Sequence, residues 1–278
     1  MSGDAYDPAQ DGARMSFKDD MSYGDYLDMD SLVAAQKPQS DAHDEMLFII
    51  QHQTSELWMR LILHELSAAR VCLSQREYSQ AFKMLSRVAR IFEQLNNAWD
   101  VLRTMTPSEY TLFRDSLGNS SGFQSHQYRL IEFMLGNRNL QMLKVHEHRP
   151  DLHNKLSQEL ERPSLYHVAL RILESELGVE FPAEAFLKQA PHQHDDVVME
   201  AWARVYQSPE KHWAQYELAE KLVDLEDYFR RWRFNHVTTV ERIIGFKRGT
   251  GGTSGVKYLR RMLEVELFPE LWNVRGAL

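Results

Sequence analysis

Cysteine is almost absent from this sequence, which contains Cys72 and no other. A single cysteine excludes an intramolecular disulfide, and it excludes any zinc or iron–sulfur site built from the cysteines of this chain alone. The same scarcity fits a reducing compartment, so we expect the protein to be cytoplasmic.

Long apolar runs and an excess of basic residues are also lacking. The first twenty residues have no apolar core of the kind found in signal peptides, and no later stretch approaches the roughly 20 apolar residues that span a bilayer. The 40 acidic residues outnumber the 32 basic ones, and the basic residues form no evident cluster. We therefore expect neither a membrane nor a nucleic acid as a partner.

Few β-branched runs and few alternating stretches are present, which leaves little that would form strands. Residues 1–20 are polar and rich in Asp, Gly and Ser, so burial cannot offset the entropy of ordering them, and they are predicted to be a flexible arm. Residues 21–278 show helical periodicity almost throughout. The prediction is an all-α protein with a single helical domain after the arm.

Three stripes of apolar residues at spacings of three and four predict the main helices of a bundle. The first stripe lies in residues 43–72 and the second ends near residue 102. The third follows the cap-like Ser208-Pro209-Glu210 and runs to Ile244, which gives a helix about 50 Å long. The stripes consist of Leu47, Ile50, Thr54, Leu57, Trp58 and Leu61, of Leu85, Val88, Phe92, Leu95, Trp99 and Leu102, and of Leu218, Leu222, Leu225, Phe229, Trp232, His236, Val240 and Ile243.

Shorter helices are predicted between and after these three. Thr106-Pro107-Ser108-Glu109 has the form of a capping box with proline at the first helical position, so a helix should begin there. Residues 124–135 and 164–177 also have helical periods. Residues 245–255 hold too many glycines for regular structure, and a terminal helix is expected over about 256–267.

His236 stands in the third stripe, where its neighbours in the row are hydrophobic, so its side chain should point inward. A buried imidazole needs a hydrogen-bonding group or a metal as its partner. Haem iron is a candidate in an all-helical protein, whereas a hydrogen-bonded core histidine is the commoner alternative. Because the sequence has no C-x-x-C-H, any haem would be held without covalent attachment.

Two pairs of side chains four residues apart are candidates for a ligand pocket. Phe48 and His52 place an aromatic face beside an imidazole, which suits a flat heteroaromatic ligand with a ring N–H. Tyr110 and Arg114 place a phenol beside a guanidinium fork that fits a carboxylate. Spacing alone leaves ordinary packing open for both pairs.

The glycine-rich residues 245–255 do not form a phosphate-binding loop, because they follow a helix and lack a lysine and a hydroxyl residue directly after the last glycine. We expect a mobile lid whose hydroxyls, among them that of Thr250, contact a ligand. His43-Asp44-Glu45 and residues 192–196, HQHDD, look like metal sites but match no ligand spacing, so both are expected at the solvated surface.

A resemblance to the tryptophan 2,3-dioxygenase family ties these features together. It is carried by SYGDYLDMDSLVAAQ (residues 22–36), FIIQHQTSELW (48–58), TPSEYTLFRDSLGNSSGFQS (106–125), WRFNH (232–236), IGFKRGTGGTSGV (244–256) and FPELW (268–272). The similarity extends over nearly the whole chain beyond the first twenty residues, and these segments are too long for chance agreement.

The resemblance implies a role for each candidate residue. His236 would be the proximal ligand of the haem iron, and Ser121 and Gly122 would border the distal face of the haem. His52 would lie close to the indole nitrogen, either as a base or only to orient the ring, and Arg114 would bind the carboxylate of tryptophan. The substrate-binding residues implied are Phe48, Ile49, Ile50, Gln51, His52, Tyr110, Arg114 and Thr250, with Tyr23, Tyr26 and Leu27 on an arm that enters a neighbouring subunit's site.

The implied fold is a helical bundle that encloses one haem b per subunit of a homotetramer. The implied reaction is cleavage of the indole C2–C3 bond of L-tryptophan by O2 to give N-formyl-L-kynurenine, the first step of the kynurenine route. An indoleamine-type haem dioxygenase of broader specificity and a haem sensor without turnover are the alternatives that share the cofactor. A helical scaffold for a partner protein would explain the helices, but not a histidine in the main stripe.

Overall fold

The computed structural model describes residues 6–278, and it divides the chain into two compact units, Met1–Gln39 and Ser40–Leu278. All the regular elements within residues 6–278 are helices, which confirms the all-α prediction. A search of the same residues for a helix long and apolar enough to cross a membrane finds none.

The first unit holds the 3-10 helix η1 (Pro8–Asp11) and the short helices α1 (Tyr23–Leu27) and α2 (Met29–Val33). A capping box begins α1, because the Ser22 hydroxyl accepts a hydrogen bond from the backbone N–H of the third helical residue. None of the residues in these three helices is buried. The flexibility predicted for residues 1–20 stays a prediction.

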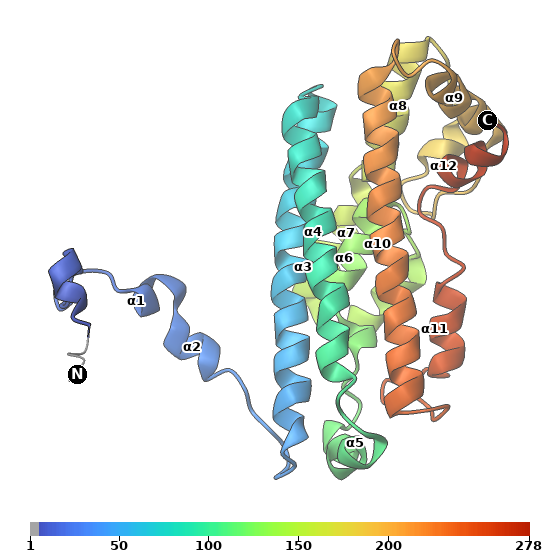
Figure 1. The fold of residues 1–278 in the computed structure, drawn as a ribbon. Coiled ribbons are helices and arrows are strands. Elements are labelled where there is room, and N and C mark those ends of the chain that lie inside the picture. Colours follow the sequence, from blue (N-terminus) through green and yellow to red (C-terminus); the bar gives the residue numbers. More distant parts are fainter. Residues whose placement is uncertain (1–5) are drawn as a thin grey trace. The chain divides into compact units, whose positions relative to one another are not determined.

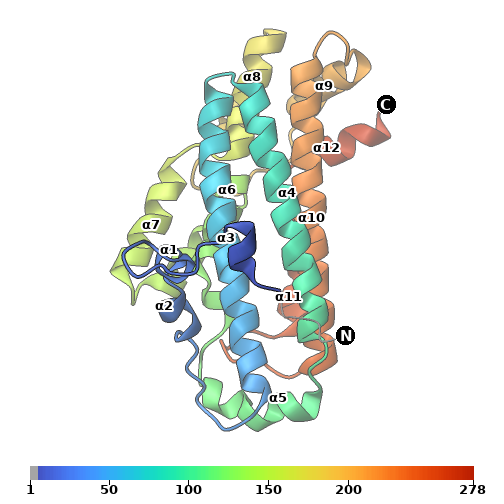
Figure 2. The ribbon, with the colours of Figure 1, turned by 60° about the vertical axis from the view of Figure 1, so that its left-hand side comes forward.

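Three long helices form the frame of the second unit: α3 (Asp44–Ser74), α4 (Tyr78–Leu102) and α10 (Trp213–Ile243). Figures 1 and 2 show them side by side along their lengths, with α4 against both α3 and α10. The stripe predicted for α4 is buried at every position, and that of α10 is buried except at His236 and Val240, which line a cavity. The periodic spacing therefore predicted both of these packing faces.

Only part of the stripe predicted for the first half of α3 packs against the core, at Leu47, Trp58 and Leu61. Ile50 and Leu57 are 46% and 53% exposed, and Met46 on the same side is 40% exposed. This helix carries apolar residues on more than one face, so their spacing alone could not show which face meets the core. The buried apolar positions are Met59, Ile62, Leu66, Ala69 and Leu73.

The start predicted for α10 is also wrong. Ser208 does not cap the helix with its side chain; instead its carbonyl accepts hydrogen bonds from the backbone N–H groups of Lys211 and His212 (3.1 and 3.2 Å) in a turn before the helix. The helix begins only at Trp213.

The remaining α-helices of the unit are α5 (Pro107–Arg114), α6 (His126–Leu135), α7 (Pro150–Glu161), α8 (Leu165–Leu177), α9 (Asp196–Gln207), α11 (Val256–Met262) and α12 (Pro269–Asn273).

The sequence predicts His192 at the solvated surface, and for this residue the prediction is wrong. Its side chain is only 3% exposed, and its Nε2 lies 2.8 Å from the buried carboxylate of Glu270. The other oxygen of Glu270 accepts a hydrogen bond from the Tyr166 hydroxyl (2.8 Å), which in turn accepts one from the indole N–H of Trp202 (3.1 Å). A carboxylate supplied by α12, far along the chain, buries this histidine.

Candidate active site

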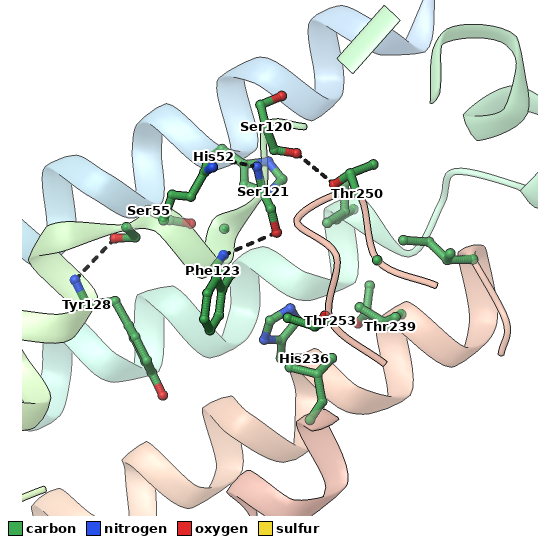
Figure 3. Close-up of a pocket in the computed structure, with 18 of the residues that line it drawn as sticks. His52, Ser55, Ser120, Ser121, Phe123, Tyr128, His236, Thr239, Thr250 and Thr253 are labelled. Atoms are coloured by element: carbon green, nitrogen blue, oxygen red, sulfur yellow. Dashed lines mark hydrogen bonds between the residues drawn. The ribbon is translucent and has the colours of Figure 1, made fainter. Parts of the chain in front are cut away.

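A cavity of about 770 Å³ lies inside the second unit, within the range of sites that enclose small molecules or cofactors. Its walls come from α3, α4, α5, α6, α10 and α11, and from the loops at residues 117–125 and 248–255. Figure 3 shows His52 and His236 on opposite sides of this space, both directed into it. The cavity therefore offers one imidazole to each face of a flat ligand.

His236 lies one turn after Trp232 on α10 and borders the cavity. The indole of Trp99, on α4, stacks on its ring at 5.1 Å with an interplanar angle of 17°. No hydrogen bond to the His236 ring is found within residues 6–278, and burial, helped by His52, lowers its pKa to about 4. The side chain is thus a neutral imidazole with a free nitrogen lone pair, which is the state that binds iron.

His52 and Phe48 share one side of α3, as their spacing predicts, with ring centroids 4.2 Å apart. The Nδ1 of His52 lies 2.7 Å from the Phe48 carbonyl, which can only accept, so Nδ1 carries the proton of the neutral ring. Burial lowers the pKa of His52, opposed in part by that carbonyl and by Glu56. Nε2 is left as an acceptor able to receive a ring N–H.

The capping box predicted for α5 is present, since the Thr106 hydroxyl and the Glu109 carboxylate each accept from the other's backbone N–H. It sets the start of the helix that carries Tyr110 and Arg114 into the cavity wall. Tyr110 is 4% exposed, and its burial raises its pKa despite the nearby Arg114 guanidinium. The phenol therefore stays protonated and can donate a hydrogen bond.

The glycine-rich loop lies against this wall. Arg114 Nη2 donates to the Arg248 carbonyl at 2.9 Å, and the Thr250 hydroxyl donates to the Ser120 carbonyl at 2.7 Å, as Figure 3 shows for the second bond. A Cβ on Gly251 would stand 2.8 Å from the Cβ of Ser121, closer than side chains approach. Glycine at this position is what lets the loop close on the residues before α6.

The structure brings most of the sequence-predicted site residues to the cavity, but not all. Phe48, Gln51 and His52 border it, and so do the other candidates of the second unit, except that Ile49 and Ile50 are not in its wall. On a helix these two positions are turned away from Phe48 by about 100° and 200°, so they leave the face that Phe48 and His52 share. Tyr23, Tyr26 and Leu27 belong to the first unit and are 77%, 75% and 40% exposed, and their role stays a prediction.

A charged cluster in the cavity wall was not predicted from the sequence. Arg129 and Arg233 both bind the fully buried carboxylate of Glu132, Arg233 through Nη2 at 2.8 Å. Asn137 donates to the same carboxylate at 3.1 Å. Two guanidiniums on one carboxylate leave an uncompensated positive charge, a fit for an anionic group of a ligand. No local motif signals it, because Glu132 and Arg233 are a hundred residues apart in the chain.

Several known proteins are similar to this chain over nearly its whole length. The sequence model described as tryptophan 2,3-dioxygenase matches residues 7–204 and 190–278. A protein of that name from Ruegeria pomeroyi is 72% identical over 275 residues, which cover 99% of both chains. A second, from Bradyrhizobium diazoefficiens, is 63% identical over 280 residues and covers 100% of both, and one from Burkholderia pseudomallei is 57% identical over 99% of this chain and 91% of its own. The chain belongs to the tryptophan 2,3-dioxygenase family.

Proposed function

We propose that this chain is a haem-dependent dioxygenase that cleaves the indole C2–C3 bond of L-tryptophan with O2 to give N-formyl-L-kynurenine. The observation that carries the proposal is that His236 shares one cavity with the His52 and Arg114 side chains. The ring of His236 has no hydrogen bond within residues 6–278. The names of the similar proteins support the same reaction.

We propose that the cavity would hold a single haem b per subunit, bound without covalent attachment. His236 would hold the haem iron, with Trp99 packed against the imidazole. Ser121 and Gly122 border the cavity and would lie against the haem, and Figure 3 shows Ser121 near His52. The surplus positive charge of Arg129 and Arg233 would suit the carboxylates at the edge of the porphyrin.

The substrate side of the cavity matches the parts of tryptophan. Phe48 offers a ring face to the indole, and His52 Nε2 accepts the indole N–H. The Arg114 guanidinium, held in place by the Arg248 carbonyl, offers its planar fork to the carboxylate. Thr250 would reach the amino group, while Tyr110 and Gln51 complete the wall.

Haem, when bound, supplies the iron at which O2 is activated. The chain supplies orientation: two fixed ends of the substrate, at Arg114 and His52, hold the indole C2–C3 edge toward the interior. It also excludes water, because the loop that carries Thr250 closes over Ser120. His52 stays neutral through its lowered pKa, so it keeps the indole N–H in place without adding a charge.

We further propose that the protein works as a homotetramer in the cytoplasm. The apolar side chains of Met46, Ile50 and Leu57 share one exposed face of α3, which a neighbouring subunit would cover. The side chains of Tyr23, Tyr26 and Leu27 are exposed on the first unit and are suited to enter a neighbouring subunit's cavity.

The test is to add haem to the purified chain, reduce it, and record the Soret band and the absorbance of N-formylkynurenine after L-tryptophan is added in air. The proposal expects a histidine-ligated spectrum and product, both lost in His236→Ala and both kept in a control change at the exposed His43. A Soret band without product would favour a haem sensor, and product from many indoles at similar rates would favour an indoleamine-type enzyme. If the chain took up no haem, a helical scaffold for a partner protein would be favoured instead.

A further inference from the structure

We propose that Arg103 is a positioning residue that holds the turn of α10 carrying His236 against α4, and thereby fixes the geometry of the bond from His236 to haem iron. The inference rests on the proposed haem site. The Arg103 side chain itself is not part of the cavity wall.

A metal-binding histidine is usually oriented by its second ring nitrogen, which donates to a carbonyl or a carboxylate. His236 has no such partner in the part of the chain that the structure describes. Two aromatic rings pack against it instead, with ring centroids 5.1 Å away for Trp99 and 5.5 Å away for Trp232. Ring packing limits the tilt of an imidazole, but the place of the ring along the helix axis must then come from the backbone that carries it.

Arg103 fixes that backbone. It is the residue directly after α4, and its guanidinium crosses to α10. There Nε donates to the Thr239 hydroxyl at 2.9 Å, while Nη2 lies 2.6 Å from the Thr238 hydroxyl and donates to both the side-chain oxygen and the carbonyl of Asn235, at 3.1 and 3.3 Å. These partners stand one residue before His236 and two and three residues after it.

The same turn is held from α4 at a second point. Asn235 donates through Nδ2 to the side-chain oxygen of Asn96 at 2.9 Å, and Asn96 donates to the Tyr228 carbonyl at 3.3 Å. Asn96, Trp99 and Arg103 are spaced by three and four residues, so they share one face of α4 and bracket His236 from one side.

Only a guanidinium can make this set of contacts, because its planar fork presents several N–H groups in fixed directions. A lysine at the same position would keep the charge and reach one acceptor. A glutamine would lose the charge and most of the bonds. Either change should leave His236 present in the cavity but free the turn that carries it, so that the strain and direction of its bond to iron change.

The test uses Arg103→Gln, Arg103→Lys and, as a matched control on the same helix, Arg90→Gln, whose wild-type side chain is 72% exposed and pairs with Glu93. The iron–histidine stretching band of each haem-loaded, ferrous protein is recorded by resonance Raman spectroscopy. In a second measurement, the rate of haem transfer from each protein to an excess of apomyoglobin is determined. Arg103→Gln is expected to shift or broaden the band and to speed haem transfer at least fivefold. Arg103→Lys should lie between, and Arg90→Gln should match the wild type.

An unchanged band with a lower melting temperature in Arg103→Gln would overturn the inference, because it would show a structural role only. Should Arg103→Gln fail to fold, Thr238→Val decides, since it removes one partner that lies outside the cavity wall and keeps the volume: a shifted band supports the inference and an unchanged one refutes it. If the wild-type protein itself shows no iron–histidine band, the proposed haem site fails, which is a distinct result.

Discussion

Replacing Arg114 tests how the cavity holds the amino-acid end of its substrate. In the structure one guanidinium nitrogen, Nη2, donates to the Arg248 carbonyl, and Nε has no partner among residues 6–278. The guanidinium is therefore held in place by the loop. Arg114→Gln removes the charge and the fork, whereas Arg114→Lys removes only the fork.

A hydrogen bond to a charged group contributes about 1.5–3 kcal/mol. We take about 3 kcal/mol for the loss of the charged fork in Arg114→Gln, which lowers kcat/KM for L-tryptophan about 150-fold. Arg114→Lys keeps the charge and should lose about 1.5 kcal/mol, or roughly tenfold. Product absorbance at varied substrate concentration gives both values.

Tryptamine supplies the control, because it has the indole and the amine but no carboxylate. The wild-type enzyme should turn it over poorly, and Arg114→Gln should lower that rate by less than about threefold, since no partner for the guanidinium is present. If Arg114→Gln impaired tryptophan and tryptamine equally, the side chain would act only by holding the Arg248 loop, and the assignment of a carboxylate clamp would be refuted.

Three further changes probe the lid, the titration of a buried histidine and the assembly. Gly251→Ala should raise KM for tryptophan severalfold, because its Cβ would stand 2.8 Å from that of Ser121, whereas Gly276→Ala, with open space around it, should not. Burial and nearby cations lower the pKa of His167 to about 3, so the unfolded chain binds a proton at this residue more readily than the folded chain does. The free energy of unfolding, measured in urea, should therefore fall as the pH drops from 6.5. The fall should be less steep in His167→Gln. Leu57→Glu puts a charge on the exposed face of α3 and should reduce the oligomer mass in sedimentation; an unchanged mass would remove that face from the interface.

The parts of the fold that rest on local pattern could be predicted from the sequence. The stripe that carries His236 has a buried hydrophobic residue at most other positions, so its inward direction follows from spacing alone. The capping box before Tyr110 and Arg114 is likewise a local signal, and it begins the helix where expected.

What the sequence could not show depends on partners distant in the chain. The first half of α3 has apolar residues on two faces, and only the packing of α4 decides that Ile50 stays exposed. His192 looked like a surface residue because its partner, Glu270, lies 78 residues away. The contacts of Arg103 are hidden for the same reason, since a terminal arginine of one helix reveals nothing about the turn of another helix that it binds.

The most direct measurement of the central claim is the fate of labelled oxygen. The haem-loaded, reduced protein is given L-tryptophan under 18O2, and the kynurenine product is analysed by mass spectrometry at early times, before the formyl oxygen exchanges or is lost. If the proposed dioxygenase reaction takes place, both labelled atoms are in N-formylkynurenine made by the wild type, and His236→Ala makes no product. A product with one labelled atom, or equal product from His236→Ala, would contradict it.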